Sequence, residues 1–243
     1  MEQRFAGQSV IVSGGSAGFG LGAAQRFAAE GATVWITGRD EARLAAAAAG
    51  TALRPVAADA CDPVAWERLV AEVVTTTGRL DVLLNNAGAG VMIAPVDEQT
   101  PAAIQESITV NLLSAIFGCR AVVPTMKAQR RGTIVNVLSI CAREAWPGWS
   151  IYSAAKAGLR QFTECLQVEL RAHGVRAGSL IPSWGATSFS AASDLPSLSP
   201  EVLAQAIQPE EFGALVADIC ATPPHLTILD ATLLPLVQRI EPL

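Results

Sequence analysis

Short apolar runs alternate along the chain with longer stretches of helical pattern. Runs this short and continuously apolar are typical of strands that are buried on both faces of a parallel sheet. We expect seven strands, at residues 9–13, 32–37, 53–58, 81–86, 132–139, 175–181 and 226–229. The pattern therefore predicts an α/β fold, a doubly wound parallel sheet of the Rossmann type with helices on both faces.

Helices are expected between successive strands. The first runs through Phe27, and the second is rich in alanine and ends at the glycine of "AAAAAG". The later helices are expected over 63–77, about 102–127 and about 150–173. The stretch 183–200 has no periodic pattern, and a loop of that length is usually functional, so we expect a substrate lid over 183–207.

Length, composition and charge exclude several classes of protein. A chain of 243 residues can still form one core, so we expect a single domain over residues 1–243. With 51% hydrophobic and 16% charged residues the chain is not disordered, and a net charge of −5 argues against nucleic-acid binding. The five cysteines include no CxxC pair, so neither a metal site nor a disulfide framework is suggested.

The sequence also carries no pattern for export or membrane insertion. The first residues lack a basic region followed by a long apolar run. No apolar run approaches the ~20 residues of a membrane span. We therefore expect a cytoplasmic protein that has no membrane contact.

A glycine-rich turn, "SGGSAGFG" at 13–20, follows the first strand and opens the first helix. Gly14, Gly18 and Gly20 allow a tight turn and a close approach of the backbone to a pyrophosphate, and the helix N-terminus adds amide donors. The spacing differs from GxGxxG. Its place in the first βα unit still favours a dinucleotide site.

The end of the second strand bears on the choice of cofactor. No acidic residue ends this strand, and Arg39 follows it directly, which suits a 2′-phosphate and favours NADP(H). The alternative is that Arg39 and Asp40 only begin a solvated helix, with Asp40 free to hold the 2′-hydroxyl of NAD(H). Asp59, after the third strand, could accept from the adenine amino group or cap a helix.

The stretch "YSAAK" holds the chain's one tyrosine, Tyr152, and Lys156 lies four residues later on the same helical face. A phenol has a pKa near 10, which is too high for acid–base chemistry at neutral pH. An ammonium at ~4 Å contributes about 4 kcal/mol at an effective dielectric of 20, and even half of this lowers the pKa by more than one unit. We predict that Lys156 lowers the pKa of Tyr152. Ser139 ends the fifth strand, where its hydroxyl could steady a developing oxyanion.

These motifs together with "NNAG" (85–88), "VNLLSAIFG" (110–118) and "NVLS" (136–139) resemble the short-chain dehydrogenase/reductase family, in that family's order. The resemblance implies hydride transfer between a nicotinamide and a secondary alcohol or ketone. Ser139 would polarise the substrate, Tyr152 would transfer the proton, and Lys156 would also bind ribose. Asn111 would hold a water in a proton relay. The glycine-free C-terminal tail is similar to that of the NADP-dependent carbonyl and hydroxy-acid reductases.

The resemblance also implies a set of cofactor contacts and a subunit arrangement. The implied contacts are Gly14, Ser16, Gly18, Phe19, Gly20, Arg39, Asp59, Ala60, Asn86, Ala87, Gly88, Tyr152, Lys156, Pro182 and Thr187. In "IPSWGAT", Ser183 replaces the family's usual glycine, and Thr187 is the expected carboxamide partner. Relatives commonly assemble as homodimers or homotetramers through two long helices.

The substrate is left open by the sequence. Arg143, Trp146 and Trp149 are expected to rim the pocket, with Trp184 and Phe189 as a cover. The aromatic residues suggest a ring or an apolar body, and Arg143 could meet an acid group; the two tryptophans could instead pack subunits together. Alternatives to the oxidoreductase are an epimerase or dehydratase on the same scaffold, or a cofactor-sensing regulator without chemistry.

Overall fold

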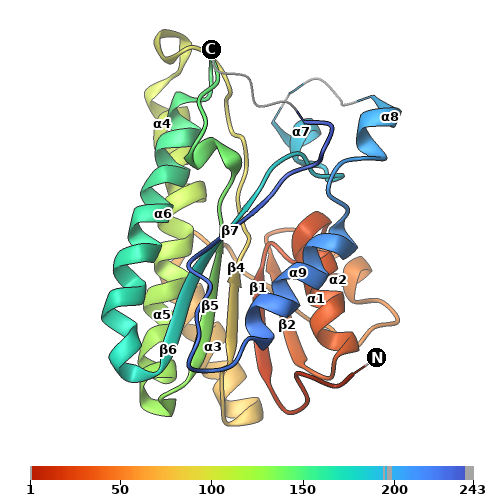
Figure 1. Cartoon of the computed structure of the whole chain (residues 1–243), viewed down its shortest axis with the longest axis vertical. Helices are drawn as coiled ribbons and strands as arrows, with labels where there is room; N and C mark the ends of the chain where they lie inside the picture. Colours follow the sequence, from red (N-terminus) through yellow and green to blue (C-terminus); the bar gives the residue numbers. More distant parts are fainter. Residues whose placement is uncertain (1, 194, 196–198, 239–243) are drawn as a thin grey trace.

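A parallel sheet forms the centre of the molecule. A computed structural model of the chain describes residues 2–193, 195 and 199–238. The strands are β1 (Ser9–Ser13), β2 (Thr33–Gly38), β3 (Arg54–Ala57), β4 (Val82–Asn85), β5 (Gly132–Val137), β6 (Val175–Pro182) and β7 (Asp230–Leu233). They pair in parallel in the order β3-β2-β1-β4-β5-β6-β7 (Figure 1). The strand order reverses between β1 and β4, so a crevice is expected at their carboxyl ends. The predicted fold class is confirmed.

One face of the sheet is covered by α1 (Gly18–Ala29), α2 (Glu41–Ala48) and α9 (Pro209–Ala221) (Figure 1). Phe27 and Phe212 enter the core on this face together with alternate residues of the strands, such as Val12. The helices α1 and α9 pack closely because Gly22 lies against α9: a Cβ there would come within 2.2 Å of the Pro209 carbonyl. No bounded helix was predicted for α9.

The opposite face is covered by α3 (Pro63–Thr77), α5 (Ser114–Gln129) and α6 (Ser150–Leu170) (Figure 1). Its core contains Trp35, Trp66 and Met126, with Ile11 of β1 pointing to this side while its neighbours point to the other. Apolar residues on both sides of each central strand explain why the strands appear as continuous apolar runs.

The helix predicted over 102–127 is one continuous helical stretch with a π-helical turn in it. It consists of α4 (Pro101–Ile108), the π turn η2 (Thr109–Leu113) and α5. By length and hydropathy alone, Pro101–Gln129 is long and apolar enough to cross a membrane, so the prediction that no segment approaches this length was wrong. Within the protein, α5 packs against the sheet and α3, as a core helix does.

The last strand begins later than the apolar pattern predicts. The prediction placed it at 226–229, whereas β7 pairs with the end of β6. Leu226 and Leu229 are 52% and 54% exposed, and Arg176 on β6 donates to the Leu226 carbonyl. This stretch is irregular, and strand pairing starts only after it, at Asp230.

Short helices connect the main elements at the carboxyl end of the sheet and elsewhere. They are η1 (Val96–Glu98), η3 (Ile140–Ala142), η4 (Arg171–His173), α7 (Phe189–Ala192) and α8 (Pro200–Leu203). The segment predicted as a lid, 183–207, contains α7 and α8, although residues 194 and 196–198 lie outside the described residues. A bridge between Gly185 and Ile207 brings the ends of this segment together. Its function as a lid stays a prediction.

Candidate active site

The catalytic candidates come from β5 and α6. Ser139 follows β5 and caps η3, where its hydroxyl accepts from the Cys141 amide at 3.3 Å. Tyr152 and Lys156 lie one turn apart in the first half of α6 and are both buried. The Lys156 Nζ donates to the Val137 carbonyl at 3.0 Å, so the side chain reaches back to the end of β5. The fold thus brings the three predicted residues to one place.

The electrostatics of Tyr152 differ from the prediction. Burial raises the pKa of Tyr152 above its ordinary value, the nearby Cys141 raises it further, and the Ser139 hydroxyl opposes the rise. The Lys156 Nζ lies 5.8 Å from the centre of the phenol ring. The predicted lowering of the tyrosine pKa is therefore wrong for this chain, because burial has the largest effect on this pKa and raises it. The phenol is held firmly in its protonated form.

The pKa of Lys156 is lowered, whereas that of Tyr152 is raised. Its side chain is 4% exposed, and burial lowers its pKa to about 8, with the Cys141 thiol acting in the opposite sense. An ammonium with this pKa can gain or lose a proton near neutrality. The site thus pairs a phenol that keeps its proton with an ammonium that releases its proton easily.

Asn111 lies in the π turn beside Lys156. A Cβ added at Gly88 would lie 3.0 Å from the Asn111 Oδ1 and 3.4 Å from the Lys156 Nζ, so the two side chains close around this glycine. Asn111 Oδ1 accepts from the Ala89 amide at 3.1 Å, and its Nδ2 donates to the carbonyls of Ala89 and Ser107. Both of its amide protons are used. A relay water would need another partner, such as a main-chain carbonyl of η2, and the relay stays a prediction.

The glycine-rich turn fits a dinucleotide. Gly14 and Gly18 have φ of 64° and 51°, and a Cβ on Gly20 would come within 2.2 Å of the Gly14 carbonyl. Helix α1 starts with Ala17 as its N-cap, so no side chain caps it, and its first turn holds no acidic residue. The amides of this turn therefore lack side-chain acceptors and suit an anionic pyrophosphate.

The "NNAG" segment at the end of β4 is hydrogen-bonded to the glycine-rich turn. The Asn86 and Ala87 amides both donate to the Ser13 Oγ at 3.1 Å, and the Asn86 Nδ2 donates to the carbonyls of Ser13 and Gly14. These bonds fix the turn against the central strands. Gly88 follows and leaves room for Lys156, which explains why a glycine suits this position.

Two residues after β2 bear on the choice between NADP(H) and NAD(H). Arg39 is exposed just after β2, where the predicted ribose contact would be. The Asp40 Oδ1 accepts from the Arg43 amide at 2.9 Å and serves as the N-cap of α2. Ser16 lies nearby, since its Oγ would be 3.5 Å from a Cβ on Gly38.

The remaining cofactor candidates are partly used in local structure. The Asp59 Oδ1 accepts from the Cys61 amide, and the Ala60 carbonyl accepts from the Trp66 indole. The Phe19 ring stacks on Phe212 of α9, with ring centroids 4.3 Å apart. These contacts leave the second Asp59 oxygen open to a ligand.

The segment predicted as a lid lies against the glycine turn at Thr187. The Thr187 Cγ2 would lie 3.1 Å from a Cβ on Gly18, and Pro182 ends β6 just before this segment. A pocket of about 580 Å³ lies between Gly18, Thr187 and Gln208. This volume is in the range of small-molecule sites.

A family model described as short chain dehydrogenase matches residues 8–195. The chain belongs to this family. Oxidoreductase asL5 of Sarocladium schorii is 32% identical over 228 residues, covering 90% of this chain and 91% of the relative. The NADP-dependent 3-hydroxy acid dehydrogenase YdfG of Salmonella typhi is 30% identical over 236 residues, with 94% and 95% covered. Solved structures are also similar: the closed form of serine dehydrogenase complexed with NADP+ superposes with a TM-score of 0.88 at 28% identity, over 97% of this chain and 98% of that one.

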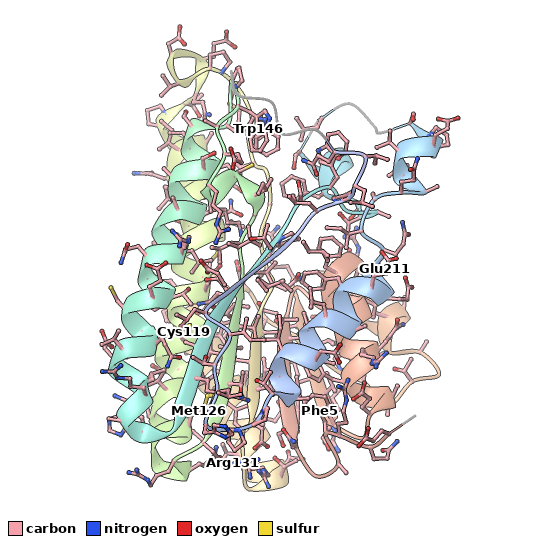
Figure 2. The ribbon with its side chains drawn as sticks, viewed as in Figure 1. Phe5, Cys119, Met126, Arg131, Trp146 and Glu211 are labelled. Carbon is pink, nitrogen blue, oxygen red and sulfur yellow. The ribbon has the colours of Figure 1, made fainter. Side chains whose placement is uncertain are left out.

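Two of the predicted substrate residues flank the phenol in this short chain dehydrogenase. The Trp149 ring lies edge-on to Tyr152 at 5.5 Å, and the Phe189 ring does so at 5.8 Å. Trp146 is half-buried, and Figure 2 shows it at the end of the molecule where α7 lies. Trp184 is 38% exposed, and its role as a cover stays a prediction.

Arg143 is engaged elsewhere in this dehydrogenase. Its Nη1 donates to the Thr232 hydroxyl at 3.0 Å and its Nη2 to the Asp230 carboxylate at 2.9 Å, both on β7. Its guanidinium already has a carboxylate partner, and its contact with an acid group of the substrate stays a prediction.

Cys141 is the site residue that sequence reasoning missed. Its thiol is buried, and it acts on the pKa of both Tyr152 and Lys156. Burial also raises the pKa of the Cys141 thiol, which keeps it neutral. Its place two residues after Ser139 was the available signal, but widely spaced cysteines gave no reason to single it out.

Proposed function

We propose that this chain is an NADP(H)-dependent oxidoreductase that interconverts secondary alcohols and ketones. The observation that carries the proposal is the convergence of Ser139, Tyr152 and Lys156 beside a glycine turn whose amides are uncapped. The family assignment and the names of the relatives support the same reaction class.

In the direction of reduction, the Tyr152 phenol donates its proton to the carbonyl oxygen of the substrate. The Ser139 hydroxyl donates a hydrogen bond to the same oxygen and stabilises the charge that develops on it. The nicotinamide of the bound cofactor supplies the hydride in this direction and accepts it in the other. Lys156, which titrates near neutrality, returns a proton toward the phenolate, so that the next turnover starts from the protonated tyrosine.

The choice of NADP(H) rests on the residues after β2. The Asp40 Oδ1 caps α2, which leaves only the other oxygen of this carboxylate for the ribose hydroxyl of NAD(H). Arg39 is free to approach a 2′-phosphate, for which a guanidinium is well suited. NAD(H) is the alternative, and Arg39→Ala should lower the preference for NADPH over NADH about tenfold or more.

The direct test measures oxidation of NADPH and NADH by absorbance with a panel of ketones. The wild type should turn over at least one ketone, and Tyr152→Phe should reduce turnover about a thousandfold or more while leaving NADPH binding intact. Cofactor binding without turnover of any carbonyl compound would contradict the proposal and favour a sensor. Inversion of a stereocentre without net cofactor consumption would favour an epimerase.

We further propose a homodimer or homotetramer in the cytoplasm. Only about a third of the most apolar 18 residues within Pro101–Gln129 is buried in one chain. On the neighbouring α6, Val168 is 64% exposed. Packing of these helices against a second copy would cover both. Light scattering of the purified chain tests this assembly: a monomer at micromolar concentration would contradict it.

A further inference from the structure

Three loops meet around Tyr152 at the carboxyl end of the sheet. They are residues 88–95, 139–150 and 183–190. A Cβ on Gly90 would lie 3.5 Å from the Phe189 ring, and a Cβ on Gly148 would lie 3.4 Å from the Ala94 backbone, so each loop touches a neighbour. These loops contain a single basic residue, Arg143.

The charge of Arg143 is balanced within the protein. Arg143 and Arg160 share the Asp230 carboxylate at 2.9 Å and 3.0 Å, and Arg160 also pairs with Glu164 at 2.9 Å. Two guanidinium groups and two carboxylates therefore form a neutral cluster between η3, α6 and β7. Turning Arg143 toward a substrate would leave the Thr232 hydroxyl without this donor, and Asp230 Oδ2 would keep Arg160 as its partner.

The other cation at the site is Lys156, whose Nζ lies 5.8 Å from the centre of the phenol ring. Its Nζ donates to the Val137 carbonyl and is buried next to Gly88. The groups that flank the phenol are the rings of Trp149 and Phe189. A carboxylate placed among these groups would lose its water and meet no free cation among the described residues, which is unfavourable.

We infer that the substrate is an uncharged ketone or secondary alcohol with an apolar or aromatic body, and that substrates bearing a carboxylate are discriminated against. The inference rests on the proposed function and narrows it. It separates this chain from relatives whose names specify hydroxy acids, such as the 3-hydroxy acid dehydrogenase YdfG.

The test uses pairs of ketones that have the same shape and differ in charge. Suitable pairs are para-acetylbenzamide with para-acetylbenzoate, oxocyclohexanecarboxamide with oxocyclohexanecarboxylate, and acetoacetamide with acetoacetate. With NADPH, kcat/KM of the amide should exceed that of the carboxylate about tenfold or more in every pair that is turned over. A carboxylate turned over as well as its amide would overturn the inference alone. No turnover of any ketone would overturn the proposed function, and the inference with it.

Two variants show whether Arg143 takes part in selection. Arg143→Gln removes the loop cation, and Arg160→Gln is the matched control because it removes the other guanidinium of the same cluster. The ratio of amide to carboxylate turnover should stay within about twofold of the wild type in both. A tenfold loss of carboxylate turnover in Arg143→Gln alone would show that Arg143 binds the anion and would overturn the inference. If Arg143→Gln does not fold, the ratios of amide to carboxylate kcat/KM in the wild type still decide whether carboxylates are discriminated against.

Discussion

Two buried polar clusters in this molecule handle charge in opposite ways. Near the amino-terminal end, the Glu30 carboxylate is 1% exposed and binds both Arg4 and Arg26, while Arg4 also binds Asp218. The hydrogen bond from Arg4 is the main reason that the pKa of Glu30 lies below its ordinary value. We call Arg4, Arg26, Glu30 and Asp218 the basal cluster. Each charged group in it has a partner of opposite sign.

The catalytic cluster has no such pairing. Burial moves the pKa of Tyr152 upward and that of Lys156 down to about 8, so both groups are pushed toward their neutral forms. The basal cluster stabilises the fold between α1, α9 and the N-terminal residues. In the catalytic cluster, burial of the Lys156 ammonium, which has no carboxylate partner in the part of the chain that the structure describes, lowers the stability of the fold. The same burial gives Tyr152 and Lys156 the shifted pKa values that acid–base chemistry uses, as is common at active sites.

The largest expected effect is on turnover in the catalytic cluster. Ser139→Ala removes a hydrogen-bond donor to the developing oxyanion and should lower kcat by about 10²–10³-fold, or ~3–4 kcal/mol of barrier. Urea unfolding should change by less than about 1 kcal/mol, since the hydroxyl bonds one amide. An unchanged kcat would remove Ser139 from the mechanism.

The next effect is on stability in the basal cluster. Glu30→Gln should lower the free energy of unfolding by about 2–3 kcal/mol near neutral pH, because charge-assisted bonds to Arg4 and Arg26 are lost. The folded pKa of Glu30 is lowered, so its contribution is present above the unfolded pKa of about 4.3 and is lost as pH falls through the folded value.

The check is urea unfolding of the wild type and Glu30→Gln at several pH values. The two should converge on acidification, while turnover at neutral pH should stay within about twofold. A stability difference that persists at acid pH would assign the effect to packing rather than to charge.

A smaller effect of opposite sign is expected for Lys156→Met. A pKa of about 8 against the unfolded value of about 10.4 means that burying the ammonium costs roughly 3 kcal/mol, of which the bond to Val137 returns about 1. The variant should therefore be about 1–2 kcal/mol more stable at pH 7 and catalytically inactive.

The pH dependence of the stability difference between the wild type and Lys156→Met tests whether the buried ammonium is its cause. Below about pH 8 the lysine is protonated in both the folded and the unfolded chain, so the cost is present in full. Between about pH 8 and about pH 10.4 only the unfolded chain holds the proton, so wild-type stability gains on that of the variant as pH rises. Lys127→Met, at the chain's other lysine, is the control and should show no such trend.

The smallest effect is expected at the exposed edge of the basal cluster. Asp218 is 62% exposed where it pairs with Arg4, so Asp218→Asn should change stability by less than about 0.5 kcal/mol. A larger loss, measured in the same urea series, would show that Arg4 needs both carboxylates to hold Glu30.

Much of this architecture was predictable because it rests on local patterns. Apolar runs bounded by turns located six of the strands, and the i, i+4 spacing of Tyr152 and Lys156 placed them on one helical face. The position of Ser139 followed from the rule that ligands bind at the carboxyl ends of parallel strands. Asp40 could be considered as a helix cap from its position alone.

What was not predictable depends on distant residues. The partner of Arg143 lies 87 residues away on β7, and Arg176 bonds to the segment before β7 across 50 residues. No pattern along the chain reports such contacts. The sign of the tyrosine pKa shift was missed for the same reason.

Helical and strand periodicity are local properties, so the order of the residues already indicates which chemical groups are present and on which elements they lie. The charge states of those groups and their orientation toward a substrate depend instead on how the elements pack together. Desolvation depends on all the atoms that surround a group, and β5, η3, α6 and α7 together supply those atoms around Tyr152.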